Sequence, residues 1–536
     1  MATLSFKGKS VIQNHHLAVK YHELIPVKKN SLTRKVTLKD NLIIHGDNLK
    51  ALKALLPTYA GKIKCIYIDP PYNLGNENWA YNDNVNSPMM QEWLGKVVDR
   101  DDLTRHDKWL CMMMPRLKLL RELLAEDGVI CISIDDVELA KLVSMLDEVF
   151  GDQNKEEVIC WRRRHNQPND KSKAIAKVAE FIVVYAKNLE TLKSRHTFYG
   201  LPLTGDFSNP DNDPKGDWAS KPWKAGTSQT GSRYVIVTPS GKVLDEEWLG
   251  DEKTYKAYLA EGRMYFPRGG DGLPRKKYYK SEREEEGQVA HNFWGHEEFG
   301  SNQEASDELK EIGIEFDNPK PTRLIKGLLT IFTSTDSIIL DSFAGSGTTA
   351  HAVLDLNKEY GGDRRFILVE CEDYANEKTA ERVRRVIKGV PNAKDGRLKA
   401  GLGGSFSYFE LGEPIEMESI LEGSRLPSYL DLARYVFYTA TGEEFLPEQV
   451  DEDRHFIGES KEHEVYLFYK PDLDYLKSTA LTLEVAKALA DHTGKKKLVF
   501  APTKYLDLND SELLAKHGLK DIEYCQLPFE IYKLKE

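Results

Sequence analysis

The chain has 536 residues, of which 74 are Lys or Arg and 85 are Asp or Glu, so its formal net charge is −11. Charged residues make up 30% and hydrophobic residues 40%, which is typical of a folded soluble protein and excludes a disordered one. A chain of this length is expected to form about three domains.

No stretch approaches the ~20 apolar residues of a membrane span, and the first ten residues lack the apolar segment of a secretory signal. Six cysteines are scattered without a CxxC pair, which argues against a disulfide framework and a zinc ribbon. We therefore expect a cytoplasmic protein with no metal site and no membrane contact.

The first 40 residues are basic and weakly patterned, and we expect a solvated N-terminal arm (1–40). From residue 41 to 190, short apolar runs alternate with amphipathic stretches, which predicts a mostly parallel sheet with both faces covered. Residues 73–86 are polar and rich in Asn, so we expect a loop there. The predicted strands are 42–47, 63–68, 129–135 and an antiparallel edge of 157–163 and 180–187, and the predicted helices are 48–56, 109–128 and 136–151.

The α/β alternation stops at residue 191, where Gly, Pro, aromatic and charged residues become interleaved, and it resumes over 316–400. Residues 401–536 carry no Gly-rich or paired-carboxylate motif. Nine acidic residues stand against two basic ones over 442–465, a balance that would repel phosphates. We therefore expect a C-terminal module that contacts proteins or forms a dimer.

A Gly-rich turn, Asp341 to Thr348 (DSFAGSGT), follows a strand and opens a helix. Its glycines permit a tight turn and close approach of a ligand, and a helix N-terminus favours electronegative groups. No Lys follows the last Gly, so the turn is not a Walker A loop. The next strand ends in Glu370, where a carboxylate can bind a ribose diol. The pair predicts a nucleoside cofactor, against the alternative of simple strand–helix packing.

A second motif, Asp69-Pro70-Pro71-Tyr72, lies at the carboxyl end of a strand, where ligands of open α/β sheets bind. Asp69 and the Pro70 carbonyl can each accept a hydrogen bond from one exocyclic amine and so aim its nitrogen lone pair. Tyr72 offers a face for a planar base, a contact of about 1–3 kcal/mol. The alternative is a tight turn whose Asp caps a helix. No His/Cys metal set accompanies the motif, which argues against metal-assisted hydrolysis.

These motifs resemble a known family. Between DPPYN (69–73) and DSFAGSGTTAHAV (341–353) the chain carries, in the family's order, WLCMMMPRLKLLRELL (109–124), DGVICISIDDVE (127–138), EFIVVYAKN (180–188), EGRMYFP (261–267) and NPKPTRLIKGLL (318–329). Over about residues 40–410 the chain looks like a β-class DNA adenine-N6 methyltransferase. Within that class it is similar to the Mod subunits of Type III restriction–modification systems.

The resemblance implies a Rossmann-like class I methyltransferase fold with circularly permuted motif order and a mostly parallel seven-stranded α/β sheet. It implies a catalytic part of the core at 41–190, an inserted target-recognition domain at 191–315 and a cofactor-binding part at 316–400. A smaller C-terminal domain at 401–536 follows.

The implied cofactor is S-adenosyl-L-methionine. The resemblance gives catalytic roles to Asp69, Pro70, Pro71 and Tyr72. It assigns cofactor contacts to Asp47, Asp69, Lys320, Asp341, Phe343, Ala344, Gly345, Ser346, Gly347, Thr348 and Glu370. The sequence ILVECED departs from the family's usual Gln-Leu-Pro-Glu, so either Glu370 or Glu372 could be the ribose ligand. Asp47 and Lys320 have a structural alternative, a Gly-Asp turn and a Lys-Pro bend.

Two basic runs are candidate DNA contacts, because base readout and phosphate positioning both use such side chains. Their alternative is an ordinary solvated face. The candidates are Arg162, Arg163 and Arg164 in WRRRHNQ (161–167), and Arg275, Lys276 and Lys277 in PRKKYYKSER (274–283).

The sequence thus predicts a site-specific methyltransferase that acts on adenine N6 in double-stranded DNA after flipping the base from the duplex. The resemblance further implies a homodimeric modification subunit that works with a restriction (Res) helicase–nuclease subunit. The chain is short for a full Type III Mod subunit, which leaves the partner open. Alternatives are a recognition subunit that guides a nuclease with catalysis secondary, a cytosine-N4 methyltransferase, or an enzyme acting on RNA or a protein amide.

Overall fold

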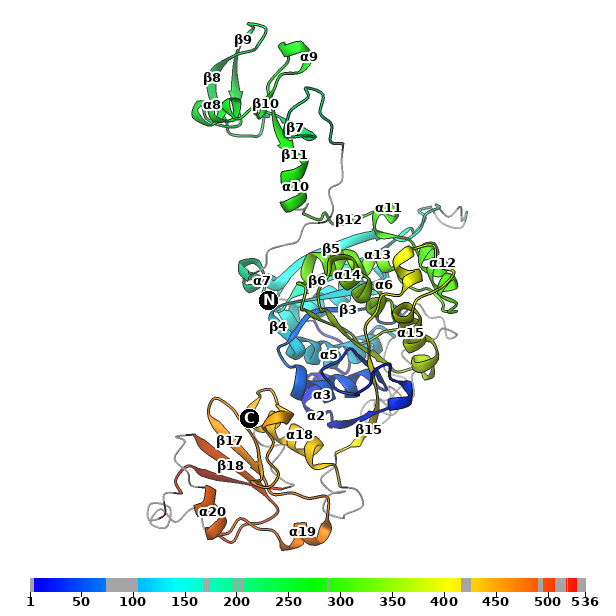
Figure 1. Ribbon diagram of the computed structural model, residues 1–536, viewed down its shortest axis with the longest axis vertical. Helices are drawn as coiled ribbons and strands as arrows, with labels where there is room; N and C mark the ends of the chain where they lie inside the picture. The colour runs from blue at the N-terminus through cyan, green and yellow to red at the C-terminus, as the bar shows by residue number, and fades with distance from the viewer. Residues whose placement is uncertain are drawn as a thin grey trace. The chain divides into compact units, whose positions relative to one another are not determined.

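A computed structural model describes residues 4–73, 105–167, 169, 171, 174–195, 201, 206–286, 289–415, 426–489, 495–506, 517 and 519–527. The chain divides into two compact units (Figure 1). The larger unit comprises Met1–His196 and Asn292–Glu536, and the smaller comprises Thr197–His291. Most of the predicted loop at 73–86 lies outside the described residues.

The larger unit is built on a ten-stranded sheet in the described part of the chain. Strands β15 to β4 run parallel, and β6 is antiparallel to both β4 and β5. The seven strands from β2 to β5 form the sheet expected from the sequence, including its antiparallel edge. Three further strands, β1, β15 and β12, extend it at the two sides. In sheet order the strands are β1 (His22–Pro26), β15 (Ser407–Pro414), β2 (Leu42–His45), β14 (Arg365–Glu370), β13 (Ile338–Asp341), β3 (Ile63–Ile68), β4 (Leu124–Ile134), β6 (Ala179–Ala186), β5 (Lys155–Arg162) and β12 (Phe293–Trp294).

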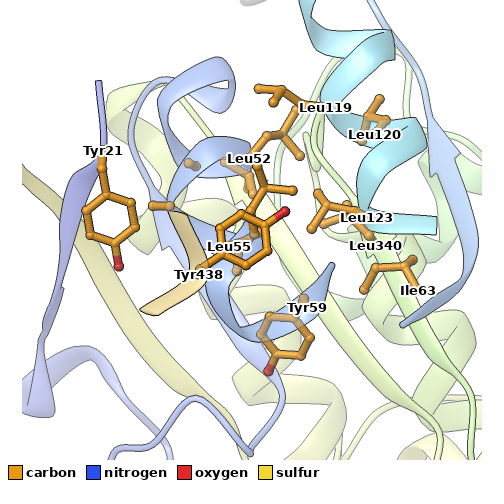
Figure 2. Packing of buried hydrophobic residues seen from close by; sticks show 14 of the residues in the cluster. Tyr21, Leu52, Leu55, Tyr59, Ile63, Leu119, Leu120, Leu123, Leu340 and Tyr438 are labelled. Atoms are coloured by element: carbon orange, nitrogen blue, oxygen red, sulfur yellow. The ribbon is translucent and has the colours of Figure 1, made fainter. Parts of the chain in front are cut away.

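Helices pack against this sheet through apolar side chains that recur at helical spacing. Leu52 and Leu55 of α3 pack with leucines of α5 and with the sheet strands in one continuous core (Figure 2). Each such leucine contributes about 1.5–3 kcal/mol through its burial. The helices are α3 (Asn48–Tyr59), α5 (Arg105–Leu123), α6 (Asp136–Phe150), α7 (Leu189–Arg195), α12 (Asn302–Ile312), α13 (Thr322–Phe332), α14 (Thr348–Tyr360) and α15 (Glu381–Lys388).

One helix is shorter at its end than the sequence predicts. The expected helix 109–128 ends at Leu123, because Leu124 already pairs with Ile63 of β3 and begins β4. A register shift follows this first pair, so that the strand continues from Val129 opposite Cys65. Strand β4 therefore extends back through residues that were expected to close a helix, although its continuous buried run begins only at Gly128.

The expectation of a solvated N-terminal arm is wrong. Strand β1 pairs antiparallel with β15, and Ile12 is fully buried. Tyr21 stacks on Tyr435 with ring centroids 4.9 Å apart. The sequence did not predict this strand, because the segment is basic and weakly patterned and its pairing partner lies almost 390 residues later in the chain.

The smaller unit has its own aromatic core of Trp223, Trp248 and Tyr255. Residues 292–315, the last part of the predicted insertion, belong to the larger unit, where β12 pairs with β5 and α12 follows. The smaller unit contains β7 (Trp218–Pro222), β8 (Ser232–Val237), β9 (Val243–Trp248), β10 (Met264–Tyr265), β11 (Arg275–Tyr279), α8 (Glu252–Ala260) and α10 (Lys280–Glu286).

The C-terminal residues form a four-stranded sheet with flanking helices. Tyr438 of α18 (Tyr429–Thr441) joins the core that contains α3, and the Phe445 amide donates to the Pro57 carbonyl at 3.1 Å (Figure 2). Within the described residues, no helix combines the length and apolar character needed to cross a bilayer. The sheet consists of β16 (Phe456–Glu459), β17 (His463–Leu467), β18 (Lys496–Ala501) and β19 (Ile522–Gln526).

Candidate active site

Four carboxylates lie at the carboxyl ends of four neighbouring parallel strands. Asp47 follows β2, Glu370 ends β14, Asp341 ends β13 and Asp69 follows β3, in the order in which the sheet places these strands. Carboxyl ends of parallel strands share one edge of the sheet, so residues far apart in the sequence meet there. This edge is where both predicted motifs come together.

Asp69 and Tyr72 of the first motif contact each other and a lysine from the second half of the chain. The Tyr72 hydroxyl donates to Asp69 Oδ1 at 2.7 Å, and Lys320 Nζ donates to Asp69 Oδ2 at 2.6 Å. Lys320 Nζ also lies 2.8 Å from the Tyr72 hydroxyl. Burial raises the pKa of Tyr72 well above its usual value, and the carboxylate of Asp69 raises it further, so the hydroxyl is neutral. These contacts differ from the alternative reading of the sequence, in which Asp69 would only cap a helix.

A second acid, Glu180, lies close to both Tyr72 and Lys320. Glu180, buried on β6, places Oε2 at 3.2 Å from the Tyr72 hydroxyl and 3.6 Å from Lys320 Nζ. Its other oxygen lies 3.2 Å from Arg163 Nε. Burial would lower the pKa of Lys320, but Asp69 and Glu180 outweigh it and raise the pKa, so the ammonium is charged. In this cluster the acids Asp69 and Glu180 alternate with the bases Lys320 and Arg163, and Asp69 is its most exposed member.

The turn after Tyr72 is fixed from within the protein. Asn73 is fully buried with a φ of 59°, and its amide donates to Glu138 Oε1 at 2.6 Å. The indole of Trp109 donates to the Pro71 carbonyl at 2.6 Å. These contacts hold the DPPY segment rigid, which a preorganised binding site requires.

The Gly-rich turn has the backbone that its sequence predicts. Gly345 and Gly347 have φ of 51° and 80°, in the left-handed region that favours glycine. Asp341 anchors the turn: its carboxylate accepts from the Phe343 amide at 3.0 Å and from the Thr349 hydroxyl at 2.5 Å. Burial raises the pKa of Asp341 to about 7.

A buried arginine that sequence reasoning missed holds the same turn from behind. Arg382 is fully buried, and its guanidinium donates to the Ser346 hydroxyl at 3.0 Å and to the Thr348 hydroxyl at 2.8 Å. It also lies 3.1 Å from His351 Nδ1. Burial and then Arg382 lower the pKa of His351 to about 3, so this imidazole is neutral and can accept the hydrogen bond.

The two candidate ribose ligands have different surroundings. Glu370 is 1% exposed, and its carboxylate accepts from the amides of Gly345 at 2.7 Å, Cys371 at 2.9 Å and Glu372 at 3.1 Å. Glu372 is half-buried. Asp47 caps α3, since its side chain accepts from the Lys50 amide at 3.1 Å. Glu370 thus already has a structural task in holding the Gly-rich turn.

Both motifs line one pocket. Its wall includes the DPPY residues, Lys320, Glu180 and most of the Gly-rich turn, whereas Asp47, Gly347 and Glu370 do not line it. The predicted site residues that line it are Asp69, Pro70, Pro71, Tyr72, Lys320, Asp341, Phe343, Ala344, Gly345, Ser346 and Thr348. Arg163, Asn302 and Asn318 are shared with a groove next to the pocket that also contains Arg164 and His165.

The basic candidates for DNA contact fall into different environments. Arg164 is exposed and Arg162 half-buried, while Arg163 faces Glu180 in the pocket wall. In the smaller unit Arg275 and Lys276 are half-buried, and Lys276 Nζ lies 3.8 Å from the ring centroid of Tyr258.

Lys277 differs from its neighbours. It is 4% exposed, and its ammonium lies 2.5 Å from carboxylate oxygens of both Asp211 and Asp213. Side chains alternate across a strand, which turns Lys277 to the face opposite Lys276. Lys277 is therefore a structural residue of this unit and not a phosphate contact, which corrects the expectation from the sequence.

Comparison with known proteins identifies the relatives of this chain. It is 35% identical over 378 residues to the Type III restriction-modification enzyme StyLTI Mod subunit of Salmonella typhimurium strain LT2, covering 67% of this chain and 55% of the relative. It is 32% identical over 433 residues to the EcoPI Mod subunit of Escherichia phage P1, covering 67% and 64%. The Type II methyltransferase M.KpnI of Klebsiella pneumoniae is 29% identical over 352 residues, covering 61% and 79%.

The chain therefore matches less than two thirds of the length of these two Mod subunits. The DNA methylase family of N6 and N4 methyltransferases matches residues 63–381, a range that begins with β3 and runs past the Gly-rich turn to the first residue of α15. That range contains the DPPY motif, Glu180, Lys320 and Glu370. Accordingly, the chain belongs to the N6/N4 DNA methylase family.

Proposed function

We propose that this protein is a site-specific DNA methyltransferase that transfers a methyl group from S-adenosylmethionine to adenine N6 in double-stranded DNA. The observation that carries the proposal is that Asp69 and Tyr72 face the Gly-rich turn across one pocket. Asp69 can accept a hydrogen bond from an amine, and the Gly-rich turn can bind a nucleoside. Their presence in one pocket suits methyl transfer between two bound molecules. The carboxylates beside the loop, at the ends of β2 and β14, suit the polar groups of a nucleoside.

The residues at the Gly-rich turn fit S-adenosylmethionine. Gly347 packs the turn against the protein, since a Cβ there would lie 3.1 Å from the Thr379 carbonyl oxygen, and Gly345, Ser346 and Thr348 beside it line the pocket. Ser346 and Thr348 accept hydrogen bonds from Arg382, which polarises their hydroxyls so that they can donate toward an anionic group such as the cofactor carboxylate. When bound, S-adenosylmethionine supplies a methyl group on a positively charged sulfur.

The DPPY residues hold the target base and its amine. Asp69 and the Pro70 carbonyl accept hydrogen bonds from N6, and the nitrogen lone pair is thereby aimed at the methyl group. Tyr72 supports the base, which is flipped from the duplex because N6 is paired inside it. As the amine nitrogen bonds to the methyl carbon, the sulfur–methyl bond breaks with its electron pair left on sulfur, and the positive charge passes to N6. The Asp69 carboxylate stabilises that charge before one N6 proton is lost to water. Positioning of the two reactants supplies most of the remaining rate enhancement.

DNA is contacted by the smaller unit and by the groove beside the pocket. Arg275 and Lys276 of the smaller unit, with Arg162 and Arg164 beside the sheet, are the basic groups suited to phosphates and base edges. The smaller unit acts as the target-recognition domain. Cofactor contacts are assigned as expected from the sequence, with Glu370 as the ribose ligand and Glu372 as the alternative; the three backbone amides that Glu370 accepts from fix the orientation of its carboxylate.

By similarity to the Mod subunits, the protein is the modification subunit of a Type III-like restriction–modification system in the cytoplasm. A homodimer, formed through the C-terminal residues, and a Res helicase–nuclease partner follow from the same similarity. Adenine is preferred over cytosine because Asp occupies position 69, as in the adenine-N6 members that the sequence resembles.

The test is tritium transfer from labelled S-adenosylmethionine to genomic DNA, followed by nucleoside digestion and mass spectrometry. We expect N6-methyladenine from the wild type and about 100- to 1,000-fold slower transfer by the Asp69→Ala variant. Predominant N4-methylcytosine would refute the base assignment and leave methyl transfer standing. Sequence-specific DNA binding without any methyl transfer would instead indicate a recognition subunit, and transfer to RNA or protein alone would remove DNA as the substrate.

A further inference from the structure

The carboxylate that is to receive the target amine is already engaged. Lys320 Nζ donates to Asp69 Oδ2 at 2.6 Å, and the Tyr72 hydroxyl donates to Oδ1 at 2.7 Å. Lys320 is only 9% exposed, so the ammonium is buried in the pocket wall, whereas the Asp69 side chain is 26% exposed and lines the pocket. In this arrangement the negative charge of Asp69 is neutralised by the protein itself.

This arrangement conflicts with the task of Asp69 in methyl transfer. The amine nitrogen gains positive charge as the methyl group reaches it, and an ammonium within hydrogen-bond distance of the same carboxylate would repel that charge. A neutralised Asp69 would also stabilise the charged amine less. The ammonium of Lys320 must therefore leave Asp69 when the base binds.

A buried ammonium needs another partner when it moves, because an unpaired buried charge is strongly unfavourable. Among the described residues Lys320 has two ion-pair partners, Asp69 and Glu180. Glu180 Oε2 lies 3.6 Å from Lys320 Nζ, so a small side-chain rotation brings the ammonium into hydrogen-bond distance. Glu180 is the second residue of β6, which lies between β4 and β5 in the sheet, and its other oxygen is 3.2 Å from Arg163 Nε.

We propose that Glu180 is a positioning residue that takes the Lys320 ammonium from Asp69 when the target base enters, and so frees Asp69 for the amine. This inference rests on the proposed methyltransferase function. Tyr72 supports the exchange, because its hydroxyl lies 2.7 Å from Asp69 and 3.2 Å from Glu180 and so touches both positions. Glu180 acts through Lys320 and does not touch the reacting atoms.

The experiment is a double-mutant cycle on the single-turnover rate of methyl transfer, measured with saturating DNA and S-adenosylmethionine. The variants are Glu180→Gln, Lys320→Met and the two combined. Glu180→Gln keeps the size of the side chain and removes the charge that attracts the ammonium. We expect it to lower the rate about tenfold in the presence of Lys320 and to have no effect in the Lys320→Met background, since no ammonium remains to be moved.

Two further measurements keep the result interpretable. Calorimetric titration with S-adenosylhomocysteine should give the wild-type dissociation constant for Glu180→Gln, which a general disturbance of the pocket would change. Glu180→Asp, which keeps the charge, should recover part of the rate. Equal losses from Glu180→Gln in the two backgrounds, or no loss in either, would overturn the inference. A wild type that methylates no DNA would instead refute the proposed function.

Discussion

Asp341 should make the stability of this protein fall as the pH rises, and Asp341→Asn should remove that dependence. Asp341 is 3% exposed, and burial raises its pKa from an ordinary value of 3.8 to about 7. A carboxyl with a raised folded-state pKa stabilises the fold fully below pH 3.8, and that contribution is lost as the pH rises through about 7. Asn keeps an acceptor for the Phe343 amide and presents a donor to the Thr349 hydroxyl.

The size of the effect follows from proton linkage. Between pH 5.5 and the folded-state pKa of about 7 the unfolded chain has lost a proton that the folded protein still holds. Each pH unit in this window costs about 1.4 kcal/mol, so the wild type loses about 2 kcal/mol relative to Asp341→Asn between pH 5.5 and 8.5. Other groups titrate equally in both proteins and cancel in the difference.

The assay is urea unfolding of the two proteins at pH 5.5, 7 and 8.5, followed by tryptophan fluorescence. Asp363→Asn serves as the matched control, because Asp363 is exposed in the loop before β14. The control should track the wild type at every pH. A difference between wild type and Asp341→Asn that stays constant over this range would refute the reasoning, because it would show that Asp341 titrates alike in the folded and unfolded protein.

Three further outcomes are expected. Asp69→Ala should lower methyl transfer about 100- to 1,000-fold, while calorimetry with S-adenosylhomocysteine should find affinity within about threefold of wild type; wild-type-like turnover would contradict the amine-acceptor role. Arg382→Met should weaken the binding of S-adenosylhomocysteine about tenfold, because the two hydroxyls of the Gly-rich turn lose their hydrogen bonds to Arg382. The control Arg121→Met, at an exposed position, should leave this affinity unchanged. Equal affinities of Arg382→Met and the wild type would show that the turn keeps its shape without Arg382. Exchange of residues 197–291 for the equivalent unit of a relative should change the methylated sequence, read by modified-base sequencing, and leave the product base unchanged; an unchanged sequence in an active chimera would place specificity elsewhere.

The sheet and the two motifs of the site were predictable because their signals are local. Each core strand is a short apolar run, and Asp69 and the Gly-rich turn follow such runs directly. Since parallel strands share a carboxyl edge, knowing that both motifs end strands was enough to bring them together.

Glu180 and Arg382 were not predicted, because their roles depend on contacts across long sequence separations. Glu180 contacts Tyr72 108 residues earlier, and Arg382 contacts Ser346 36 residues earlier. Two weak signals existed. Glu180 is an acid that opens the apolar run EFIVVYA, and Arg382 shares a helical face with the buried Thr379, Val383 and Val386. Strand β1 was missed for the same reason, since its pairing partner β15 lies almost 390 residues later in the chain.

The order of the strands has a consequence for how the protein is made. Strands β2 and β3 follow one another in the sequence, yet β14 and β13 lie between them in the sheet. About 300 residues separate the end of β3 from the end of β14, and ribosomes would take roughly 15–60 s to add them. During that time the nascent chain holds two apolar strands, while β14 and β13, which lie between them in the sheet, have not yet been synthesised. Because β13 and β14 carry the Gly-rich turn and Glu370, the pocket cannot form on the growing polypeptide until about 370 residues have been synthesised.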